Sequence, residues 1–423
     1  MKQQTLALHA SYEKEAQGTM AVPLYMTTAY DFGSADFAAS SFNLQQGTDH
    51  VYTRVGNPTT AILERRFATI EGGSGALAIS SGMGAIFYAV LNIAGAGDNI
   101  IVASKLYGGT ITLFTQTLKR LGIEARFYDV HNPDEITPLI DEHTKGIFFE
   151  TISNPSIDVP DIEAIVAIAN AHGILTIADN TVATPFLCQP LLLGVDVVVH
   201  SASKYTTGQG LAIGGLMVER NDLVAKILEN PRYPFFNEPE TSYHGLVFAN
   251  CPASAVLFTF RARMILLRDT GAVLSPFNAW LFIQGLETLS LRMQQHSRSA
   301  FEIAKFLATH SQVKKVNYPL LSSDRSYANA SKYLTKGASG LVSFEVESFE
   351  VAKKILDGVK LFSIVANIGD SKSIINHSAS TTHQQLSPQE LENAGISAGL
   401  IRLSIGLEDT QDLIEDLEQA LSE

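Results

Sequence analysis

The sequence predicts an α/β protein with a mostly parallel, doubly wound sheet, followed by a smaller α+β domain. From about residue 60, short apolar runs rich in β-branched residues alternate with stretches of helical length. Such alternation places parallel strands in one sheet with helices on both faces. After about residue 255 the pattern changes to a long amphipathic stretch and strands of alternating polarity, which is typical of an α+β domain.

The first region is expected to hold seven strands and several helices. The strands are predicted at 76–80, 100–103, 125–130, 146–150, 174–178, 196–199 and 213–218, and intervening helices at 84–92, 110–121 and 161–172. Another helix is predicted before them. Asn57 can cap it, Pro58 suits its first position, and Gly72 and Gly73 end it.

The later region opens with a long helix in "SPFNAWLFIQGLETLSLRMQQHSRSAFEIAKFLATH", for which we expect a break near Gly285. The segments "GLVSFEVE" and "GLIRLSIGLE" alternate like strands of an antiparallel sheet, and helices are expected at 349–356 and 410–421. We therefore predict an irregular N-terminal arm at 1–56, a large domain at 57–255 and a C-terminal domain at 256–423. The arm is expected to contact a neighbouring subunit.

Composition disfavours several classes of protein. Acidic residues outnumber basic ones by 43 to 30, so the formal charge of −13 repels nucleic acid and anionic membranes. Cys188 and Cys251 lie far apart, which favours neither a disulfide scaffold nor a zinc site, and no metal is expected. The sequence starts without a long apolar stretch, so we expect a cytoplasmic protein. No G-x-G-x-x-G follows a strand, which disfavours a nicotinamide-binding domain.

Five of the predicted strands are followed by residues that could bind a ligand. They are Ser81, Gly82 and Met83 after the first strand, Tyr107 after the second, Asn154 after the fourth, Asp179 after the fifth, and Ser201, Ser203 and Lys204 after the sixth. In a doubly wound sheet, ligands bind beyond the carboxyl ends of the strands. We therefore expect these side chains to lie at one edge of one sheet.

Each of these residues also has a structural interpretation. The segment "SSGM" can be a plain helix cap, Tyr107 can cover core, and Asn154 before a proline is an ordinary turn signal. Asp179 can pair with a cation, and Lys204 can be a solvated amine. His200 is expected to be merely hydrogen-bonded.

Taken together, the residues favour pyridoxal phosphate. Its aldehyde condenses with a lysine amine, for which Lys204 is the candidate. Its ring nitrogen needs a carboxylate, for which Asp179 is the candidate, and its ring stacks on an aromatic side chain. Its phosphate needs the N–H groups of a helix start and hydroxyls such as those of Ser201 and Ser203.

The sequence resembles the cysteine/methionine-metabolism family of pyridoxal-phosphate enzymes, of fold type I. The matching segments are "YTRVGNPTT", "SSGM", "LYGGT", "ETISNP", "ADNTVATP", "HSASKY" and "IRLSIGLED", in family order over essentially the whole chain. Within the family it is most similar to the O-acetylhomoserine sulfhydrylase branch, through "SYHGLVF" and "NIGDSKSIINHSASTTHQQLS" among others. Gly109 stands where methionine γ-lyases place a cysteine, and Asn367 where lyases carry serine.

The resemblance implies a role for each matching residue. Lys204 would bond to the cofactor aldehyde, Asp179 would pair with the ring nitrogen, Tyr107 would stack on the ring and Asn154 would touch its 3-hydroxyl side. Gly82, Met83, Ser201 and Ser203 would hold the phosphate, with Tyr52 and Arg54 reaching it from the neighbouring subunit. Arg402 would bind the substrate carboxylate, with Asn367 nearby, and Tyr107 and Tyr52 would assist Lys204 in catalysis near the leaving group.

The strand pattern around Arg402 gives a separate reason to expect that this side chain binds a carboxylate. In "LIRLSIGL" the apolar Ile401, Leu403 and Ile405 share one strand face, and Arg402 points to the other. There it can form a structural ion pair or bind a carboxylate with its planar fork.

The implied reaction converts O-acetylhomoserine and sulfide to homocysteine and acetate, in a homotetramer of dimers that share active sites. Sister reactions stay open: those of cystathionine γ-synthase, O-succinylhomoserine sulfhydrylase or methionine γ-lyase. A non-catalytic protein that kept the fold is the alternative from another class.

Overall fold

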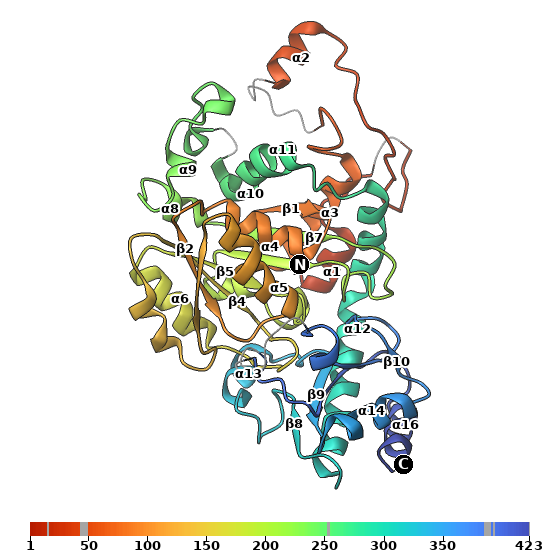
Figure 1. The fold of residues 1–423 in the computed structure, drawn as a ribbon. Coiled ribbons are helices and arrows are strands. Elements are labelled where there is room, and N and C mark those ends of the chain that lie inside the picture. Colours follow the sequence, from red (N-terminus) through yellow and green to blue (C-terminus); the bar gives the residue numbers. More distant parts are fainter. Residues whose placement is uncertain (15–16, 43–49, 252–253, 385–390, 392–393, 423) are drawn as a thin grey trace.

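The computed structural model describes residues 1–14, 17–42, 50–251, 254–384, 391 and 394–422. In this part of the chain, a large sheet and a smaller sheet lie at opposite ends of one long helix (Figure 1). No helix among the described residues is long and apolar enough to cross a bilayer.

The large sheet contains the seven predicted strands, each close to its predicted bounds. They are β1 (Gly75–Ile79), β2 (Asn99–Ala103), β3 (Glu124–Tyr128), β4 (Thr144–Glu150), β5 (Leu175–Asp179), β6 (Val197–Ser201) and β7 (Gly215–Glu219). Their spatial order is β1-β7-β6-β5-β4-β2-β3. Strand β7 is antiparallel to both of its neighbours, and the other pairs are parallel. The prediction of a mostly parallel sheet is confirmed.

Helices cover the large sheet because its strands are apolar on both sides. All residues of β2 and β4 are buried, as expected for strands between two helical layers. The covering helices include α3 (Pro58–Glu71), α4 (Gly82–Leu91), α5 (Gly108–Thr112) and α6 (Ile162–Ala171). The helix predicted at 110–121 continues from α5 as a π-helical segment, Leu113–Leu118. Shorter helices are α7 (Thr184–Leu187), α8 (Leu223–Ile227), α9 (Pro234–Asn237), α10 (Leu257–Arg261) and α11 (Arg268–Thr270).

Helix α3 begins and ends at the residues that its sequence predicts. The side chain of Asn57 accepts a hydrogen bond from the N–H of Thr59, and Pro58 occupies the first turn. Gly72 follows the helix with φ of 85°, a left-handed conformation that glycine adopts without a steric cost.

The N-terminal arm contains two short helices, α1 (Gln3–His9) and α2 (Ala35–Phe42). Helix α1 packs on its own chain, where Gln3 donates hydrogen bonds to the carbonyl oxygens of Ile70 and Pro185. Helix α2 projects from the body of the molecule (Figure 1). Residues 15–16 and 43–49 of the arm lie outside the described residues, and the contact with a neighbouring subunit stays a prediction, as do the domain limits.

The C-terminal region begins with α12 (Pro276–Thr309), which runs for 34 residues without interruption. The expected break near Gly285 is therefore wrong. Gly285 packs directly against the backbone of Thr206 and Thr207, where a Cβ atom would collide with the Thr206 carbonyl oxygen. The glycine allows a close approach between the helix and the loop after β6, rather than ending the helix.

The smaller sheet has the order β10-β11-β12-β9-β8. Its strands are β8 (Lys315–Asn317), β9 (Leu341–Glu345), β10 (Ser363–Ile364), β11 (Ile374–His377) and β12 (Leu400–Ser404), and the neighbouring helices are α13 (Tyr327–Tyr333), α14 (Phe349–Gly358) and α16 (Thr410–Ser422). The predicted strands β9 and β12 pair antiparallel, which confirms the α+β prediction.

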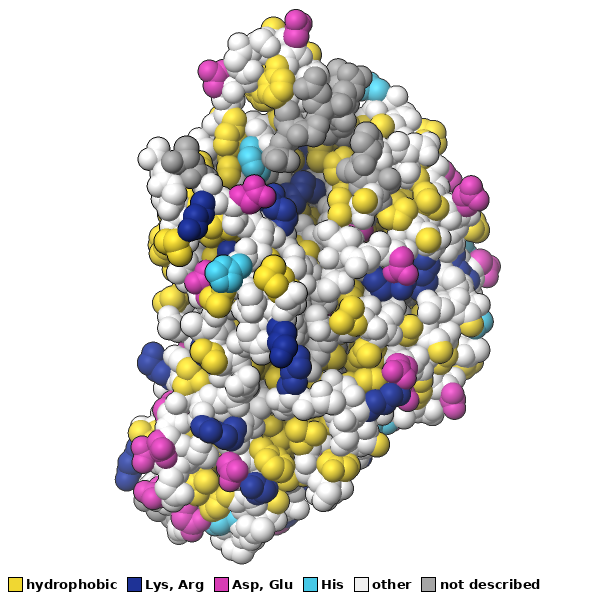
Figure 2. Space-filling view, turned by 180° about the vertical axis from the view of Figure 1, so that it is seen from behind, with side chains coloured by type: hydrophobic (Ala, Val, Ile, Leu, Met, Phe, Trp, Pro, Cys, Tyr) yellow, Lys and Arg dark blue, Asp and Glu magenta, His cyan; other side chains and the backbone are white. Residues whose placement is uncertain are grey.

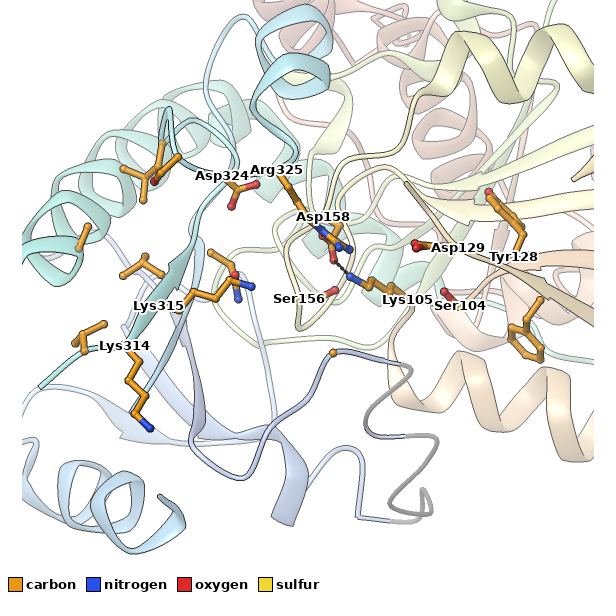
Figure 3. A pocket seen from close by; sticks show the side chains of 18 residues that line it. Ser104, Lys105, Tyr128, Asp129, Ser156, Asp158, Lys314, Lys315, Asp324 and Arg325 are labelled. Atoms are coloured by element: carbon orange, nitrogen blue, oxygen red, sulfur yellow. Dashed lines mark hydrogen bonds and ion pairs between the residues drawn. The ribbon is translucent and has the colours of Figure 1, made fainter. Parts of the chain in front are cut away.

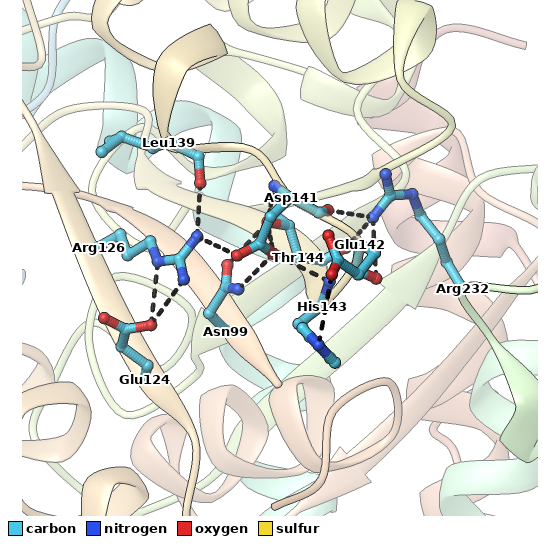
Figure 4. Close-up of polar contacts among 9 residues, drawn as sticks. All are labelled: Asn99, Glu124, Arg126, Leu139, Asp141, Glu142, His143, Thr144 and Arg232. Carbon is cyan, nitrogen blue, oxygen red and sulfur yellow. Dashed lines mark hydrogen bonds and ion pairs between the residues drawn. The ribbon is translucent and has the colours of Figure 1, made fainter. Parts of the chain in front are cut away.

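A polar cluster joins the amino ends of β2 and β4 to the middle of β3 (Figure 4). The carboxylate of Asp141 accepts hydrogen bonds from the Asn99 amide at 2.9 Å and from the Arg126 guanidinium at 2.7 Å. The N–H of His143 and the hydroxyl of Thr144 also donate to it. Partial burial opposes the charge, but these donors hold the pKa of Asp141 well below its usual range.

We expect Gly285→Ala to destabilise the protein. Helix propensity favours alanine over glycine by about 1 kcal/mol. Overpacking against a backbone carbonyl costs about 1–3 kcal/mol, so the steric effect should be the larger one. The melting temperature from calorimetry is the measurement, and Gln284→Ala at an exposed neighbouring position is the control. A melting temperature at or above that of the wild type would contradict the packing argument.

Asp141→Asn should lower the melting temperature near pH 7 and have a smaller effect in acid. The folded pKa lies below the unfolded value of about 3.9, so the carboxylate stabilises the fold above about pH 4 and loses this contribution as the pH falls further. Calorimetry of variant and wild type across this range is the measurement. Glu142→Gln, at an exposed side chain of the same loop, is the control. An equal difference at every pH would show that the charge is not responsible.

Candidate active site

Loops at the carboxyl edge of the large sheet enclose a cavity of about 730 Å³. They follow β1, β2, β4, β5 and β6, as the sequence predicts. The cavity is lined by ten of the predicted site residues, namely Gly82, Met83, Tyr107, Asn154, Asp179, Ser201, Ser203, Lys204, Asn367 and Arg402. Its size falls within the range of sites for small molecules and cofactors, about 300–1,000 Å³.

Lys204 lies just beyond β6 and projects its amine into this cavity. The Nζ atom donates a 2.6 Å hydrogen bond to Oδ1 of Asn367, which comes from the C-terminal region. Burial, together with the positive charge of Arg402, lowers the pKa of Lys204 to about 8. The amine is therefore shifted toward its neutral, nucleophilic form.

Asp179 ends β5 and faces the same cavity. Its Oδ1 accepts a 2.8 Å hydrogen bond from the N–H of Thr181. Burial raises the pKa of Asp179, because the charged form loses its hydration. A cationic group placed against this carboxylate would restore its charged form.

Glu150 is a second buried carboxylate, opposite Asp179 in the register of β4 and β5. Its two oxygens accept hydrogen bonds from the N–H groups of Tyr107 at 2.8 Å and of Asn154 at 3.0 Å. Burial and the nearby Asp179 raise the pKa of Glu150 well above its usual value. Glu150 thus ties together the loops that carry Tyr107 and Asn154.

The start of α4 forms one end of the cavity. Ser81 caps this helix by accepting a hydrogen bond from the N–H of Gly84 at 3.0 Å. A Cβ atom on Gly82 would lie 2.6 Å from the Cβ of Ser201, so only glycine allows the two loops to meet so closely. The hydroxyl of Ser201 makes no hydrogen bond within the described chain and lines the cavity beside the helix start.

Ser203 also lines the cavity, but its hydroxyl already has partners. Its Oγ accepts a 3.0 Å hydrogen bond from the N–H of Gly214 and lies 3.2 Å from the carbonyl oxygen of the same residue. Of the two hydroxyl groups predicted to hold the phosphate, only that of Ser201 is therefore free to donate a hydrogen bond to it.

Arg402 lies in the middle of β12 and is 2% exposed. One nitrogen, Nη1, donates to Oδ1 of Asn154 at 2.9 Å, and Nη2 donates to the carbonyl oxygen of Asn367 at 2.9 Å. Its Nε atom has no hydrogen-bond partner, and no carboxylate of the described residues lies within 4 Å. A structural ion pair, the alternative from the sequence, is therefore not formed. Burial lowers the pKa of Arg402 to about 10, a value that still leaves it cationic at neutral pH.

Tyr52 and Arg54 are not among the residues that line the cavity of their own chain. They lie together, with the Arg54 guanidinium carbon 5.5 Å from the centre of the Tyr52 ring, and Arg54 donates a hydrogen bond to the carbonyl oxygen of Arg268. Their predicted role at a neighbouring subunit's site stays a prediction.

Sequence reasoning missed Glu150, although the end-of-strand rule that identified Asp179 points to it equally. Glu150 is the last residue of the predicted strand 146–150. Thr181 and Thr382, which also line the cavity, carry no comparable signal. His200 is hydrogen-bonded through Nε2 to Glu71 at 2.9 Å, which confirms its structural interpretation.

The cavity fits pyridoxal phosphate. It brings a lysine amine of lowered pKa, a buried carboxylate, an aromatic ring and a helix N-terminus with a free hydroxyl into one space. These groups match an aldehyde, a protonated ring nitrogen, a ring face and a phosphate. Fold and site together define a pyridoxal-phosphate-dependent enzyme. No group of three or more potential metal ligands occurs among the described residues.

The chain belongs to the Cys/Met metabolism PLP-dependent enzyme family, which it matches over residues 4–422. It is 44% identical to the O-acetyl-L-homoserine sulfhydrylase of Leptospira meyeri, over 99% of this chain and 96% of that protein.

Two solved structures share the fold. One is the crystal structure of a putative O-acetylhomoserine (thiol)-lyase from Campylobacter jejuni, which is 50% identical to this chain, with a TM-score of 0.97 and an alignment that covers 100% of both chains. That structure contains an N'-pyridoxyl-lysine-5'-monophosphate. The structure of metB from Corynebacterium glutamicum is 30% identical with a TM-score of 0.85, covering 100% of this chain and 98% of that one.

We expect Glu150→Gln to weaken cofactor binding by about tenfold, the effect of losing one ordinary hydrogen bond in a buried site. A glutamine side chain has one acceptor oxygen, so it can satisfy only one of the N–H groups of Tyr107 and Asn154. The dissociation constant, from titration of the cofactor-free protein, is the measurement. Glu163→Gln, at a side chain 51% exposed, is the control. Unchanged affinity would show that Glu150 does not position these loops for the cofactor.

Proposed function

We propose that this protein converts O-acetyl-L-homoserine and sulfide to L-homocysteine and acetate. The observation that carries the proposal is that Lys204, Asp179 and Arg402 line one cavity. Lys204 and Asp179 lie at the ends of two strands of the large sheet, whereas Arg402 lies in a strand of the smaller sheet, far away in the sequence. The names of the similar Leptospira and Campylobacter proteins support the choice of substrate.

Pyridoxal phosphate, when bound, supplies an aldehyde that bonds to an amine and a ring that withdraws electrons from the substrate's α-carbon. Lys204 would bond to the aldehyde, Asp179 would hold the ring nitrogen in its protonated form, and Tyr107 would cover the ring. Asn154 would contact the 3-hydroxyl side of the ring. Gly82, Met83, Ser201 and Ser203 would hold the phosphate.

Arg402 would bind the α-carboxylate of the substrate. Its buried charge has no acidic partner among the described residues, and its Nε–H is unpaired. Isolated buried charges are costly, so a substrate carboxylate that enters this space gains a strong charge-assisted partner. Asn367 would orient the same end of the substrate, because it contacts both Arg402 and Lys204.

The amine of Lys204 would move protons at the α-carbon of the substrate. Its lowered pKa, to about 8, suits a group that takes the α-proton and later returns one. Tyr107 and Tyr52 would assist near the leaving group. The γ-carbon–oxygen bond of the ester breaks and acetate leaves, and the sulfur of sulfide then forms a bond to the same carbon.

A shared active site would explain the positions of Tyr52 and Arg54. The mouth of the cavity carries the hydrophobic side chains of Leu211 and Ile213, which are 59% and 66% exposed in the single chain. Hydrophobic side chains are also exposed in several separate places on the face in Figure 2. We propose dimers that exchange Tyr52 and Arg54, assembled as a homotetramer in the cytoplasm.

The substrate is tested by product analysis. The purified enzyme is given O-acetylhomoserine with sulfide or with cysteine, and O-succinylhomoserine with sulfide, and the products are separated by mass. We expect homocysteine from the acetyl ester and sulfide as the dominant product. Cystathionine as the main product, a preference for the succinyl ester, or oxobutyrate formed without sulfide would each assign the enzyme to a sister reaction.

Lys204→Ala should abolish both turnover and the covalent attachment of the cofactor. Reduction with borohydride links the wild-type lysine to the cofactor irreversibly, and mass spectrometry then detects the added mass on the peptide that contains Lys204. The variant should show no added mass. Normal turnover by Lys204→Ala would overturn the proposed mechanism.

A further inference from the structure

Helix α12 packs against the residues that follow β6, and one of these residues is Lys204. We call residues 202–208 the lysine turn. Gly285 and Arg292 are seven residues apart in α12, so they lie on the same face of the helix, two turns apart. Gly285 packs against the backbone of the lysine turn, and the Arg292 side chain is hydrogen-bonded to the same turn. This face of α12 therefore meets the turn that carries Lys204.

The guanidinium of Arg292 joins the lysine turn to the helix. Its Nη1 donates to the carbonyl oxygen of Tyr205 at 2.6 Å. Its Nη2 donates to the carbonyl oxygens of Thr206 at 3.3 Å and of Gly285 at 2.6 Å. Its Nε donates to the hydroxyl oxygen of Thr288 at 3.2 Å. The planar group thus holds a turn and a helix at a fixed separation, which the single nitrogen of a lysine cannot do.

Arg292 carries a buried charge that no carboxylate neutralises. It is 9% exposed, and it forms no ion pair among the residues that the structure describes. Burial lowers the pKa of Arg292 to about 10, which leaves it cationic at neutral pH. Buried charges are costly, and an apolar side chain of similar volume is often the more stable choice. This cost favours a role for Arg292 beyond the packing of α12.

The C-terminal region also holds the lysine turn, through other backbone groups. The N–H of Ser371 donates to the carbonyl oxygen of Gly208 at 2.8 Å. Gly369 lies against Tyr205, where a Cβ atom would be 2.7 Å from the Tyr205 nitrogen. A Cβ atom on Gly208 would collide with the Arg292 guanidinium. The turn is therefore packed closely on both α12 and the segment that contains Gly369.

The same segment of the C-terminal region holds the amine of Lys204. Oδ1 of Asn367 accepts the 2.6 Å hydrogen bond from Nζ of Lys204, and Asn367 lies two residues before Gly369. At the backbone, the N–H of Gly208 donates to the carbonyl oxygen of Lys204 at 3.0 Å. A shift of the lysine turn relative to Asn367 would therefore break the contact at Nζ.

We propose that Arg292 is a positioning residue for Lys204. By holding the carbonyl oxygens of the lysine turn, it sets where the Nζ amine lies in the active-site cavity. Arg292 does not line this cavity, so it acts only through the turn. The inference rests on the proposed bond between Lys204 and the cofactor aldehyde.

The first experiment measures the pKa of Lys204 in the cofactor-free protein. The protein is labelled with acetic anhydride across a range of pH, and mass spectrometry quantifies the label on the peptide that contains Lys204. In the wild type, burial and the charge of Arg402 lower this pKa to about 8. The other titratable groups of the described residues that line the cavity are those of Tyr107, Glu150 and Asp179.

Arg292→Lys should raise the pKa of Lys204 toward the ordinary value of about 10.4. The substituted side chain keeps the charge but loses the fork, so the lysine turn loosens and the amine gains water. Thr288→Val is a milder second variant at an exposed position, because it removes only the acceptor of Nε. It should raise the pKa of Lys204 by a smaller amount.

Arg261→Lys is the matched control. Arg261 is also a buried arginine with a pKa lowered to about 10, and it donates to the carbonyl oxygen of Phe235 at 2.9 Å and to Oδ1 of Asn92 at 2.8 Å. This substitution should lower the melting temperature but leave the pKa of Lys204 unchanged. An unchanged pKa in both Arg292→Lys and Thr288→Val, or an equal rise in Arg261→Lys, would overturn the proposal.

The second experiment measures how the cofactor attaches to the cofactor-free protein, by absorbance and by borohydride reduction. Arg292→Lys should slow the attachment at Lys204 about tenfold, the effect of losing one charge-assisted hydrogen bond, and Arg261→Lys should leave it unchanged. Attachment to a different lysine in the wild type would refute the proposed function and this inference with it. Equal attachment rates in wild type and Arg292→Lys would overturn the inference alone.

Discussion

Arg402 holds a full positive charge inside the protein without an acidic partner among the described residues, and the geometry of the active site depends on it. Its hydrogen bonds run to Asn154 of the large sheet's edge and to Asn367 of the C-terminal region, so the same side chain connects the two halves of the cavity. Its charge also contributes to the lowered pKa of Lys204. Burying a charge beside neutral acceptors alone is costly, and this cost supports the proposal that Arg402 binds the carboxylate of the substrate.

The second constraint is the direction of the strands. Every strand of the large sheet except β7 runs the same way, so the loops after β1, β2, β4, β5 and β6 reach a common edge. At that edge the backbone N–H groups of Tyr107 and Asn154 converge on one carboxylate, that of Glu150. The sheet brings the loops together, and Glu150 sets their spacing. Burial raises the pKa of both Glu150 and Asp179, and the nearby Asp179 adds to the effect on Glu150.

The active site shares two of its loops with a second cavity. The segment after β2 and the segment after β4 each present one residue to the active site and another, two positions earlier or later, to a second cavity of about 870 Å³ between the two sheets (Figure 3). The long helix α12 runs from the large sheet to the smaller one.

Sequence alone determined the seven strands of the large sheet and the helices that cover them, because strands buried on both faces form short apolar runs. It also indicated the site residues at the strand ends, because ligands of a doubly wound sheet bind beyond the carboxyl ends of its strands. It also identified Lys204 and Asp179. It mistook Gly285 for a helix break, since only the packed structure shows the Thr206 backbone against that glycine. The hydrogen bonds of Arg402 to Asn154 and Asn367, and the absence of a carboxylate beside it among the described residues, were decided by tertiary structure. Which charges meet is a long-range property, set by how two sheets pack, and it has no signature in the residues next to each charge along the chain.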